Sequence, residues 1–421
     1  MKASNMKKRL FISPCNEKRT EFLQSLQIDL NRIGHDMEFI EQENDIEIHF
    51  EPFDYESASD EEVKALMRSA FEELKKIKLN KESTKKFILK MEDGVIQNLI
   101  AKGSEVDIEK IKPEVRICES KEDKDIFRYF RYYQSVPNSP GVGRRFSAII
   151  YDVGQKTERI IGIIGLQGAA YSSSSRDEYL KWSNIDSRAE EKRKKELGLR
   201  RTMQLAILTA IPPYNYLFGS KLAALLSLSN PIQEYFSDRY KTPLLAVFTT
   251  CAYGLHAAMY NRIQLRKIPS NDHYSYYDNE LFERIGETNL FSQIMLSDKT
   301  AEIAKNMFSN LPNERQGLSF RTPLSKSRSI SKALSVCGLN KKVLYMYPMG
   351  VYIGCLHENN LNILRNGSES INDAILDLDV DDVRKYWFSE VLNKKINSQN
   401  ETLLKNHDVQ SIMLSNYLEK D

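Results

Sequence analysis

Apolar residues recur at helical spacing near the start of the chain. Residues 20–34 and 59–78 predict amphipathic helices, and the second follows a capping-box pair formed by Ser59 and Glu62. Between them, the alternating residues 46–50 predict one short strand within an acidic stretch. A third helix is predicted over residues 82–102. The first 112 residues are therefore expected to form a mainly helical region.

The middle of the chain alternates between apolar strand-like runs and helical patterns. A hairpin is predicted from residues 145–153 and 159–167, which the turn Gly154-Gln155-Lys156 joins. Further elements are a helix at 121–133, strands at 201–211 and 243–249, and helices at 220–228 and near 256–262. This order predicts an α/β (α+β) fold, with a mixed sheet flanked by helices.

The last 150 residues predict a C-terminal α/β extension. Residues 343–356 are strongly apolar and predict two strands broken around Pro348, and helices are expected at 380–392 and 401–418. The expected domains are 1–112, helical; 113–268, the core; and 269–421, the extension.

Composition narrows the class of protein. The chain has 421 residues, of which 41% are hydrophobic, and it contains no apolar run long enough to cross a membrane. Five widely spaced cysteines form no CxxC pair, and six histidines show no metal-binding spacing. We therefore expect a cytoplasmic protein with no metal and no membrane contact. The formal net charge of +2 is compatible with nucleic-acid binding but does not indicate it alone.

The turn at residues 212–219 is a candidate anion cradle. A strand that ends in a proline-kinked turn before a helix leaves backbone N–H groups free for phosphate, and the expected ligand-binding residues are Tyr214, Asn215, Gly219, Ser220 and Lys221. The turn resembles motif A of the GNAT acyltransferase fold, with Tyr214, Leu217 and Gly219 at the motif positions. Leu217 departs from that pattern, so no cofactor is predicted, and acetyl-CoA belongs to an alternative function.

Two further residues are candidates for catalysis. Residues 258–265 resemble the final helix of the GNAT fold, and the resemblance implies that Tyr260 acts as the general acid. The alternative is that Tyr260 is an aromatic residue at the edge of the core. His256 follows Tyr253 and Gly254 and is the histidine with a candidate catalytic role.

A polar insertion at residues 172–199 holds the other candidates. If Arg176 and Asp177 form an exposed pair beside Trp182, Arg176 could bind phosphate, Trp182 could stack on a base and Asp177 could be catalytic. Alternatively, Asp177 caps the loop by accepting backbone N–H groups. Arg188, Arg200 and Arg201 belong to a basic run that predicts either a nucleic-acid or partner contact or a solvated helix face.

A more specific resemblance covers about residues 110–390. The motifs that carry it are Ser175 to Ser183, Leu197 to Arg201, Gly219 to Leu222, Thr249 to Gly254 and His357 to Asn360. The sequence resembles the DruA family of the Druantia anti-phage system. The resemblance implies a role in bacterial defence beside a helicase-like partner.

Three functions compete at this stage. The first is a defence component with a GNAT-like platform that binds DNA or RNA, a nucleotide or the helicase-like partner. The second is an acyl-CoA-dependent acyltransferase that modifies a phage or host target, although residues 201–211 offer no carboxylate as a base. The third is a nuclease, for which the predicted strands carry too few carboxylates.

Overall fold

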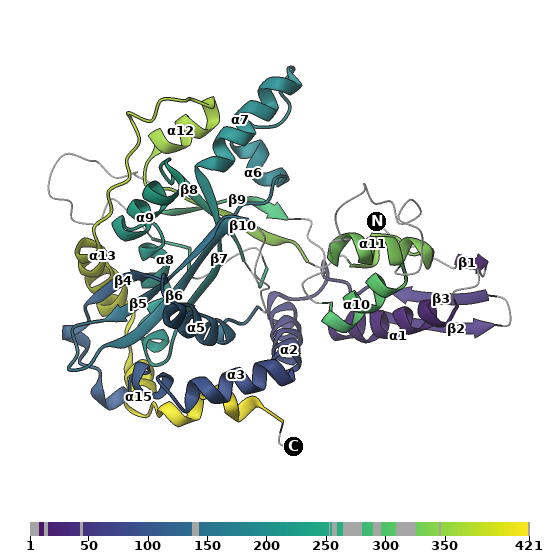
Figure 1. The fold of residues 1–421 in the computed structure, drawn as a ribbon, viewed down its shortest axis with the longest axis horizontal. Helices are drawn as coiled ribbons and strands as arrows, with labels where there is room; N and C mark the ends of the chain where they lie inside the picture. Colours follow the sequence, from purple (N-terminus) through teal and green to yellow (C-terminus); the bar gives the residue numbers. More distant parts are fainter. Residues whose placement is uncertain are drawn as a thin grey trace. The chain divides into compact units, whose positions relative to one another are not determined.

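The computed structural model describes residues 8–11, 16–42, 45–136, 143–251, 253–254, 259–263, 280–288, 296–308, 326–344 and 347–419. The chain forms two compact units, and both are built from segments distant in sequence (Figure 1). Unit 1 comprises residues 1–74 and 289–348, and unit 2 comprises residues 75–288 and 349–421. The boundary at residue 74 falls inside helix α2 (Asp60–Leu79).

Unit 1 is a small antiparallel sheet with helices. Its strands are β1 (Lys8–Phe11), β2 (Asp36–Gln42) and β3 (Asp45–Glu51), in the order β1-β3-β2. Its helices include α1 (Asn16–Arg32), α10 (Asp298–Asn306), α11 (Lys326–Val336) and the short 3-10 helix Lys341–Leu344.

A buried carboxylate ties the two segments of unit 1 together. Asp29 on α1 is 1% exposed and accepts hydrogen bonds from the Thr300 hydroxyl at 2.6 Å and the Ser297 backbone N–H at 2.8 Å. Ser25, one turn earlier on α1, also contacts the Thr300 hydroxyl at 2.6 Å. Since buried polar groups need partners, α1 and α10 depend on each other.

Unit 2 is organised around a seven-stranded mixed sheet in the order β4-β5-β6-β7-β8-β10-β9. The strands are β4 (Pro113–Ile117), β5 (Arg145–Asp152), β6 (Arg159–Gly168), β7 (Thr202–Ala210), β8 (Ala246–Thr250), β9 (Phe282–Thr288) and β10 (Met349–Gly354). Among the strands described, only β7 and β8 pair in parallel. Such a pair needs a crossover, which helices α8 (Gly219–Leu226) and α9 (Asn230–Tyr240) supply.

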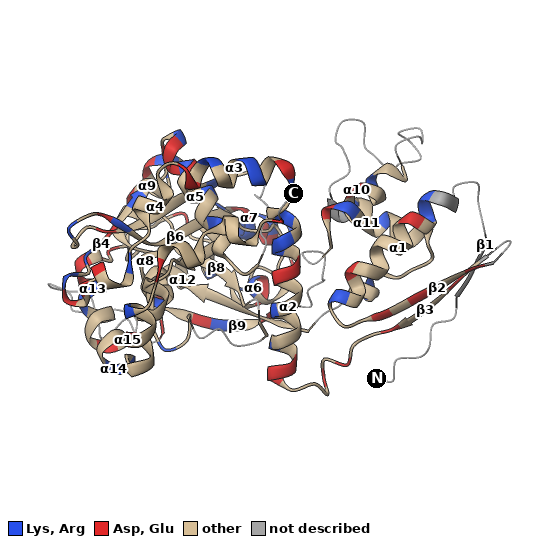
Figure 2. Cartoon of the chain, turned by 90° about the horizontal axis from the view of Figure 1, so that it is seen from below, with Lys and Arg blue, Asp and Glu red and all other residues tan. Residues whose placement is uncertain are grey.

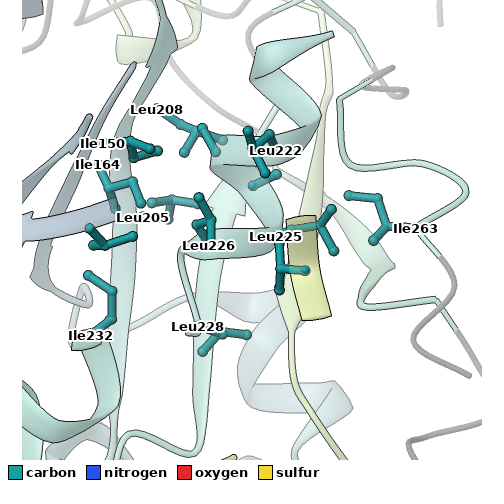
Figure 3. Close-up of a cluster of buried hydrophobic side chains, with 14 of the residues drawn as sticks. Ile150, Ile164, Leu205, Leu208, Leu222, Leu225, Leu226, Leu228, Ile232 and Ile263 are labelled. Atoms are coloured by element: carbon teal, nitrogen blue, oxygen red, sulfur yellow. The ribbon is translucent and has the colours of Figure 1, made fainter. Parts of the chain in front are cut away.

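Both faces of this sheet are buried. On β5, Ala148 and Ile150 face one apolar cluster, and Ile149 and Tyr151 face another, as the two-residue period of a strand requires. The first cluster contains α8, α9 and α13 (Val380–Tyr386), and Figure 3 shows its leucine and isoleucine side chains interdigitating. The second contains α3 (Glu82–Glu92), α5 (Lys121–Phe130) and residues 409–414.

A third apolar cluster lies over β8 and β10. It contains Trp182 and residues of α12 (Glu358–Asn366), next to the helices α6 (Ser174–Tyr179) and α7 (Arg188–Arg200). The remaining elements are short: α4 (Ile96–Leu99), α14 (Asn393–Lys395), α15 (Ser398–Lys405), the π-helix Trp387–Leu392, and the 3-10 helices Gly103–Glu105, Ile108–Lys110, Arg131–Tyr133, Tyr214–Leu217, Val409–Ile412 and Leu414–Tyr417.

The predicted α/β class is confirmed, and so is the hairpin of β5 and β6. The expected strand pair at 343–356 is wrong, because Lys341–Leu344 is a 3-10 helix and β10 alone is a strand. The expected helix at 401–418 ends at Lys405, and 3-10 helices follow it. Strands β1, β2 and β9 were not predicted. The division into three consecutive domains remains a prediction.

The packing of α7 on Trp182 gives a testable prediction. A Cβ at Gly198 would lie 1.9 Å from Cζ2 of the Trp182 ring, which is 0% exposed and donates from Nε1 to the Leu364 carbonyl at 2.9 Å. Gly198→Ala should therefore lower the free energy of unfolding by roughly 1–3 kcal/mol or more. Urea denaturation followed by tryptophan fluorescence measures this in unit 2, because Trp182 and Trp387, the two tryptophans of the chain, both lie there.

Gly94→Ala is the matched control. A Cβ there would make ordinary van der Waals contact with the Lys90 carbonyl at 3.5 Å. Equal losses in the two variants would contradict the packing described for Gly198.

Candidate functional site

A buried cluster of three charges fixes the polar insertion. The Asp177 carboxylate is 5% exposed and accepts from Arg176 Nη2 at 2.6 Å through Oδ1 and from Lys195 Nζ at 2.6 Å through Oδ2. The Ser173 backbone N–H donates to Oδ2 at 3.2 Å. Arg176 also donates to the carbonyls of Ala170 and Tyr171 at 2.6 and 3.0 Å. The cluster therefore joins α6, α7 and the chain after β6.

Aromatic rings enclose this cluster. The Arg176 guanidinium lies 5.4 Å from the Trp182 ring centroid and 5.6 Å from that of Phe248. Arg176 and Trp182 are 2% and 0% exposed. The expectation that Arg176 and Asp177 form an exposed pair beside an accessible Trp182 is therefore wrong. Asp177 instead caps the loop, as the alternative interpretation had it.

A basic groove lies at the C-terminal end of α7. The cavity has a volume of about 680 Å³ and is lined by Arg144, Tyr171, Glu196, Leu197, Leu199, Arg200, Arg201, Tyr240, Lys241 and Thr242. Four of these side chains are cationic and one is anionic. Among the residues that the structure describes, none of the four cations forms an ion pair with a carboxylate. We call this cavity the basic groove.

Two of the four cations also hold the fold. Arg144 donates to the carbonyls of Arg200 at 2.7 Å and Thr202 at 3.2 Å and also reaches the Leu199 carbonyl, so it caps the C-terminus of α7. Arg201 donates to the carbonyls of Ser368 and Glu369, the second at 2.8 Å. Burial lowers the pKa of both guanidinium groups, but arginine stays charged at neutral pH.

The other two cations are accessible. The side chains of Arg200 and Lys241 are exposed, and Lys241 follows α9 in the left-handed conformation with φ of 54°. Tyr171 is 55% exposed, which is unusual for a large aromatic side chain. Figure 2 shows Lys and Arg interleaved with Asp and Glu along the helices.

The predicted contact residues do not lie together. Arg200 and Arg201 line the basic groove, whereas Arg188 begins α7, about 18 Å away along the helix axis. Arg176 and Trp182 are buried beneath the insertion. The sequence analysis did not identify Arg144, Tyr171, Tyr240 and Lys241, although Tyr240-Lys241 at a helix end followed by Thr242-Pro243 was a visible signal.

The turn after β7 is covered by the chain itself. Tyr214 is 1% exposed and donates to the buried Asp152 carboxylate at 2.9 Å, while Asn215 is exposed. Asn400 on α15 donates to the Tyr216 carbonyl at 2.9 Å, and Trp387 donates to the Phe218 carbonyl at 3.3 Å. Gly219 is needed because a Cβ there would lie 2.7 Å from the Tyr214 carbonyl oxygen. Ser220 is half-buried at the start of α8.

Lys221 is a buried amine that forms no ion pair with any carboxylate among the described residues. It is 8% exposed, and its Nζ donates to the Asn261 carbonyl at 2.5 Å. Burial, aided by the nearby cations Lys395 and Arg262, lowers the pKa of Lys221 to about 8. A lysine in this state is costly to protonate, and its role as a ligand residue stays a prediction.

Tyr260 lies in the apolar core, and His256 lies outside the described residues. The Tyr260 hydroxyl is 3.2 Å from that of Thr249, and its ring packs on Phe282 with centroids 4.8 Å apart. Burial raises the pKa of Tyr260 to about 12. This placement matches the alternative interpretation of Tyr260 as a core aromatic, and its catalytic role stays a prediction.

These features define an α/β protein with a cationic groove that carries two tyrosines. Within the described part of the chain, no group of histidine, cysteine and acidic residues could hold a metal ion. In the same part, no helix combines the length and the apolar character that crossing a bilayer requires.

Comparison with known proteins identifies the family. Residues 64–366 match the family model described as Druantia protein DruA, so the chain belongs to the DruA family. It is 29% identical over 284 residues to the Druantia protein DruA of Escherichia coli (strain UMEA 4076-1). That match covers 63% of this chain and 65% of the relative, so the chain spans about two thirds of that protein's length. No solved structure matches.

The buried charge cluster predicts a large loss of stability on substitution of Asp177. Asp177→Asn leaves Arg176 and Lys195 buried without a carboxylate, and removing one partner of a buried ion pair costs about 3–5 kcal/mol. Urea denaturation with tryptophan fluorescence should show this loss. Glu190→Gln, which removes an exposed partner of Arg193, should leave the midpoint nearly unchanged. A wild-type midpoint in Asp177→Asn would refute the structural role.

Lys221 predicts a pH dependence. Its pKa is about 8 in the folded chain and near 10.5 in the unfolded chain, so between these values the unfolded state binds more protons and stability rises with pH. Lys221→Met should therefore be more stable than the wild type at pH 7, and this advantage should shrink as the pH rises from 8 towards 10. The measurement is the difference in unfolding free energy at each pH. An advantage independent of pH would mean that the pKa of Lys221 is not lowered in the folded chain.

Proposed function

We propose that this chain is a component of a Druantia anti-phage defence system and that unit 2 is its platform for nucleic acid. The support for the first part is membership of the DruA family over residues 64–366. A helicase-like partner and a cytoplasmic location belong to the same proposal. The first follows from the family resemblance, and the second from the cysteine usage.

The basic groove supports the second part of the proposal. Nucleic acid is recognised by cations that neutralise phosphates and by aromatic side chains that stack on bases. The groove offers both, with Arg200 and Lys241 at its surface and Tyr171 and Tyr240 in its lining. This arrangement replaces the predicted contacts through Arg176 and Trp182, which are buried.

We also propose that unit 2 has a GNAT-like core. The support is the strand-turn-helix segment between β7 and β8, the parallel pair of the sheet, where the sequence resembles motif A. An acyltransferase is not favoured, because Tyr214 and Leu217 are buried and the C-terminal residues Trp387 and Asn400 bind the turn.

A phage plating assay tests this function. A strain that carries the whole defence system should lose protection when this gene is omitted, and the double variant Arg200→Gln/Lys241→Gln should lose most of it, because the accessible cations of the groove are gone. Lys86→Gln on α3, where the lysine is exposed and pairs with Glu82, is the matched control and should protect fully.

The stability of the variants is the control for the plating assay. Both variants should show wild-type urea midpoints, since Arg200 and Lys241 are exposed. Full protection without the gene would reject the defence role, and full protection by the double variant would reject the groove as the working surface.

A further inference from the structure

We propose that the basic groove binds single-stranded nucleic acid, with one unpaired base stacked on Tyr171 and Tyr240 and the flanking phosphates on Arg200 and Lys241. The proposal rests on the proposed function and names the ligand class of the same site. Its residues come from four segments: the residue before β5, the chain after β6, the end of α7 and the end of α9.

The charge balance of the groove favours an anion. Four cations and one carboxylate, Glu196, line it, and Glu196 has its own partner in Lys192 at 3.9 Å. Arg201 is 7% exposed, and its Nε has no hydrogen-bond partner among the described residues. That Nε atom is itself buried, so Arg201 contributes a positive charge to the wall of the groove rather than an accessible N–H donor.

The cations do more than cap helices. The groove lies at the C-termini of α7 and α9, where the helix dipoles are negative and would repel a phosphate. Arg144 satisfies the carbonyls at the end of α7 and so offsets that repulsion. Arg200 and Lys241 make no hydrogen bond or ion pair through their side chains among the described residues. Their charges remain for a ligand.

The two tyrosines favour single-stranded over double-stranded nucleic acid as the ligand. Tyr171 is 55% exposed, and the Lys195 ammonium lies 4.9 Å from its ring centroid. The Tyr240 ring has the Arg144 guanidinium at 5.3 Å and the Phe236 ring at 4.9 Å, so packing holds it in place. Tyr171 is therefore the exposed ring of the groove and Tyr240 a half-buried one beside it. An exposed ring in a cationic groove can stack on a base, and only unpaired bases have a free face to offer.

The size of the groove fits one nucleotide. Its volume of about 680 Å³ is in the range of sites that hold small molecules, and it is too small for a duplex, which needs a surface or a channel. A strand would therefore place one base inside and continue across the rim. The recognition is expected to be independent of sequence, because every base has a stacking face.

Binding of the full chain to a fluorescein-labelled 12-nucleotide oligothymidine, measured by anisotropy at several salt concentrations, tests the proposal. Tyr171→Ala should weaken binding by about 5- to 150-fold, whereas Tyr171→Phe, which keeps the ring, should bind like the wild type. Arg200→Gln and Lys241→Gln should each weaken binding and flatten the slope of log K against log salt by about 0.7. Equal binding by Tyr171→Ala and Tyr171→Phe would overturn the stacking contact.

Glu196→Gln is expected to change the affinity in the opposite direction to the variants above. Removal of the one carboxylate of the groove should strengthen binding roughly two- to threefold, because the repulsion of a nearby phosphate is lost. Lys86→Gln, on α3, should leave the affinity unchanged. Weaker binding by Glu196→Gln would contradict an anionic ligand in the groove.

Two competitors separate the sources of the ligand. A 12-base-pair duplex and free thymidine monophosphate should compete much more weakly than the unlabelled single strand. Equal competition by the duplex would overturn the single-strand assignment, and equal competition by the mononucleotide would mean that the groove holds a free nucleotide. If omission of the gene abolishes protection but the oligonucleotide does not bind, this inference fails while the defence role stands.

Discussion

The contact of Asp177 with Arg176 and Lys195 is the interaction on which the candidate site depends. These residues bring together α6, the middle of α7 and the chain after β6, beside the apolar contacts of Trp182. Because all three charges are buried, each needs the other two, and the insertion has one stable arrangement. That arrangement sets the position of Tyr171 and the end of α7, and therefore the shape of the basic groove.

An element of the fold could be predicted where the residues of its own segment specify it, and not where it depends on contacts with distant residues. Strands β5 and β6 alternate or run apolar over eight to ten residues, so their pattern alone specifies them. Strand β2 could not be seen, since its sequence Asp36–Gln42 has charged residues on the outer face and only Met37 is fully buried. The 3-10 helices at 341–344 and 409–417 depend on tertiary contacts, such as the bond from Tyr133 to the Ile412 carbonyl at 2.7 Å.

The candidate site was predictable in its chemistry but not in its geometry. The basic run and Trp182 predicted a nucleic-acid contact; Arg200 and Arg201 do line the groove, whereas Trp182 is buried. The sequence could not show that Arg176 bonds its neighbour Asp177, because burial of a charge depends on partners far along the chain. Likewise, Arg144 precedes β5 and Lys241 follows α9, and the pairing of β5, β6, β7 and β8 brings both to the end of α7.

The division of unit 1 has a consequence for synthesis on the ribosome. Asp29 on α1 lacks its hydrogen-bond partners Ser297 and Thr300 until the ribosome has added more than 260 further residues. At about 5–20 residues per second, the buried face of α1 is without its partner helix for roughly 15–50 s. The intervening residues include most of the large sheet, which can form first. A nascent chain therefore exposes the apolar face of an amphipathic helix, and chaperones that recognise such surfaces have a long time in which to bind it.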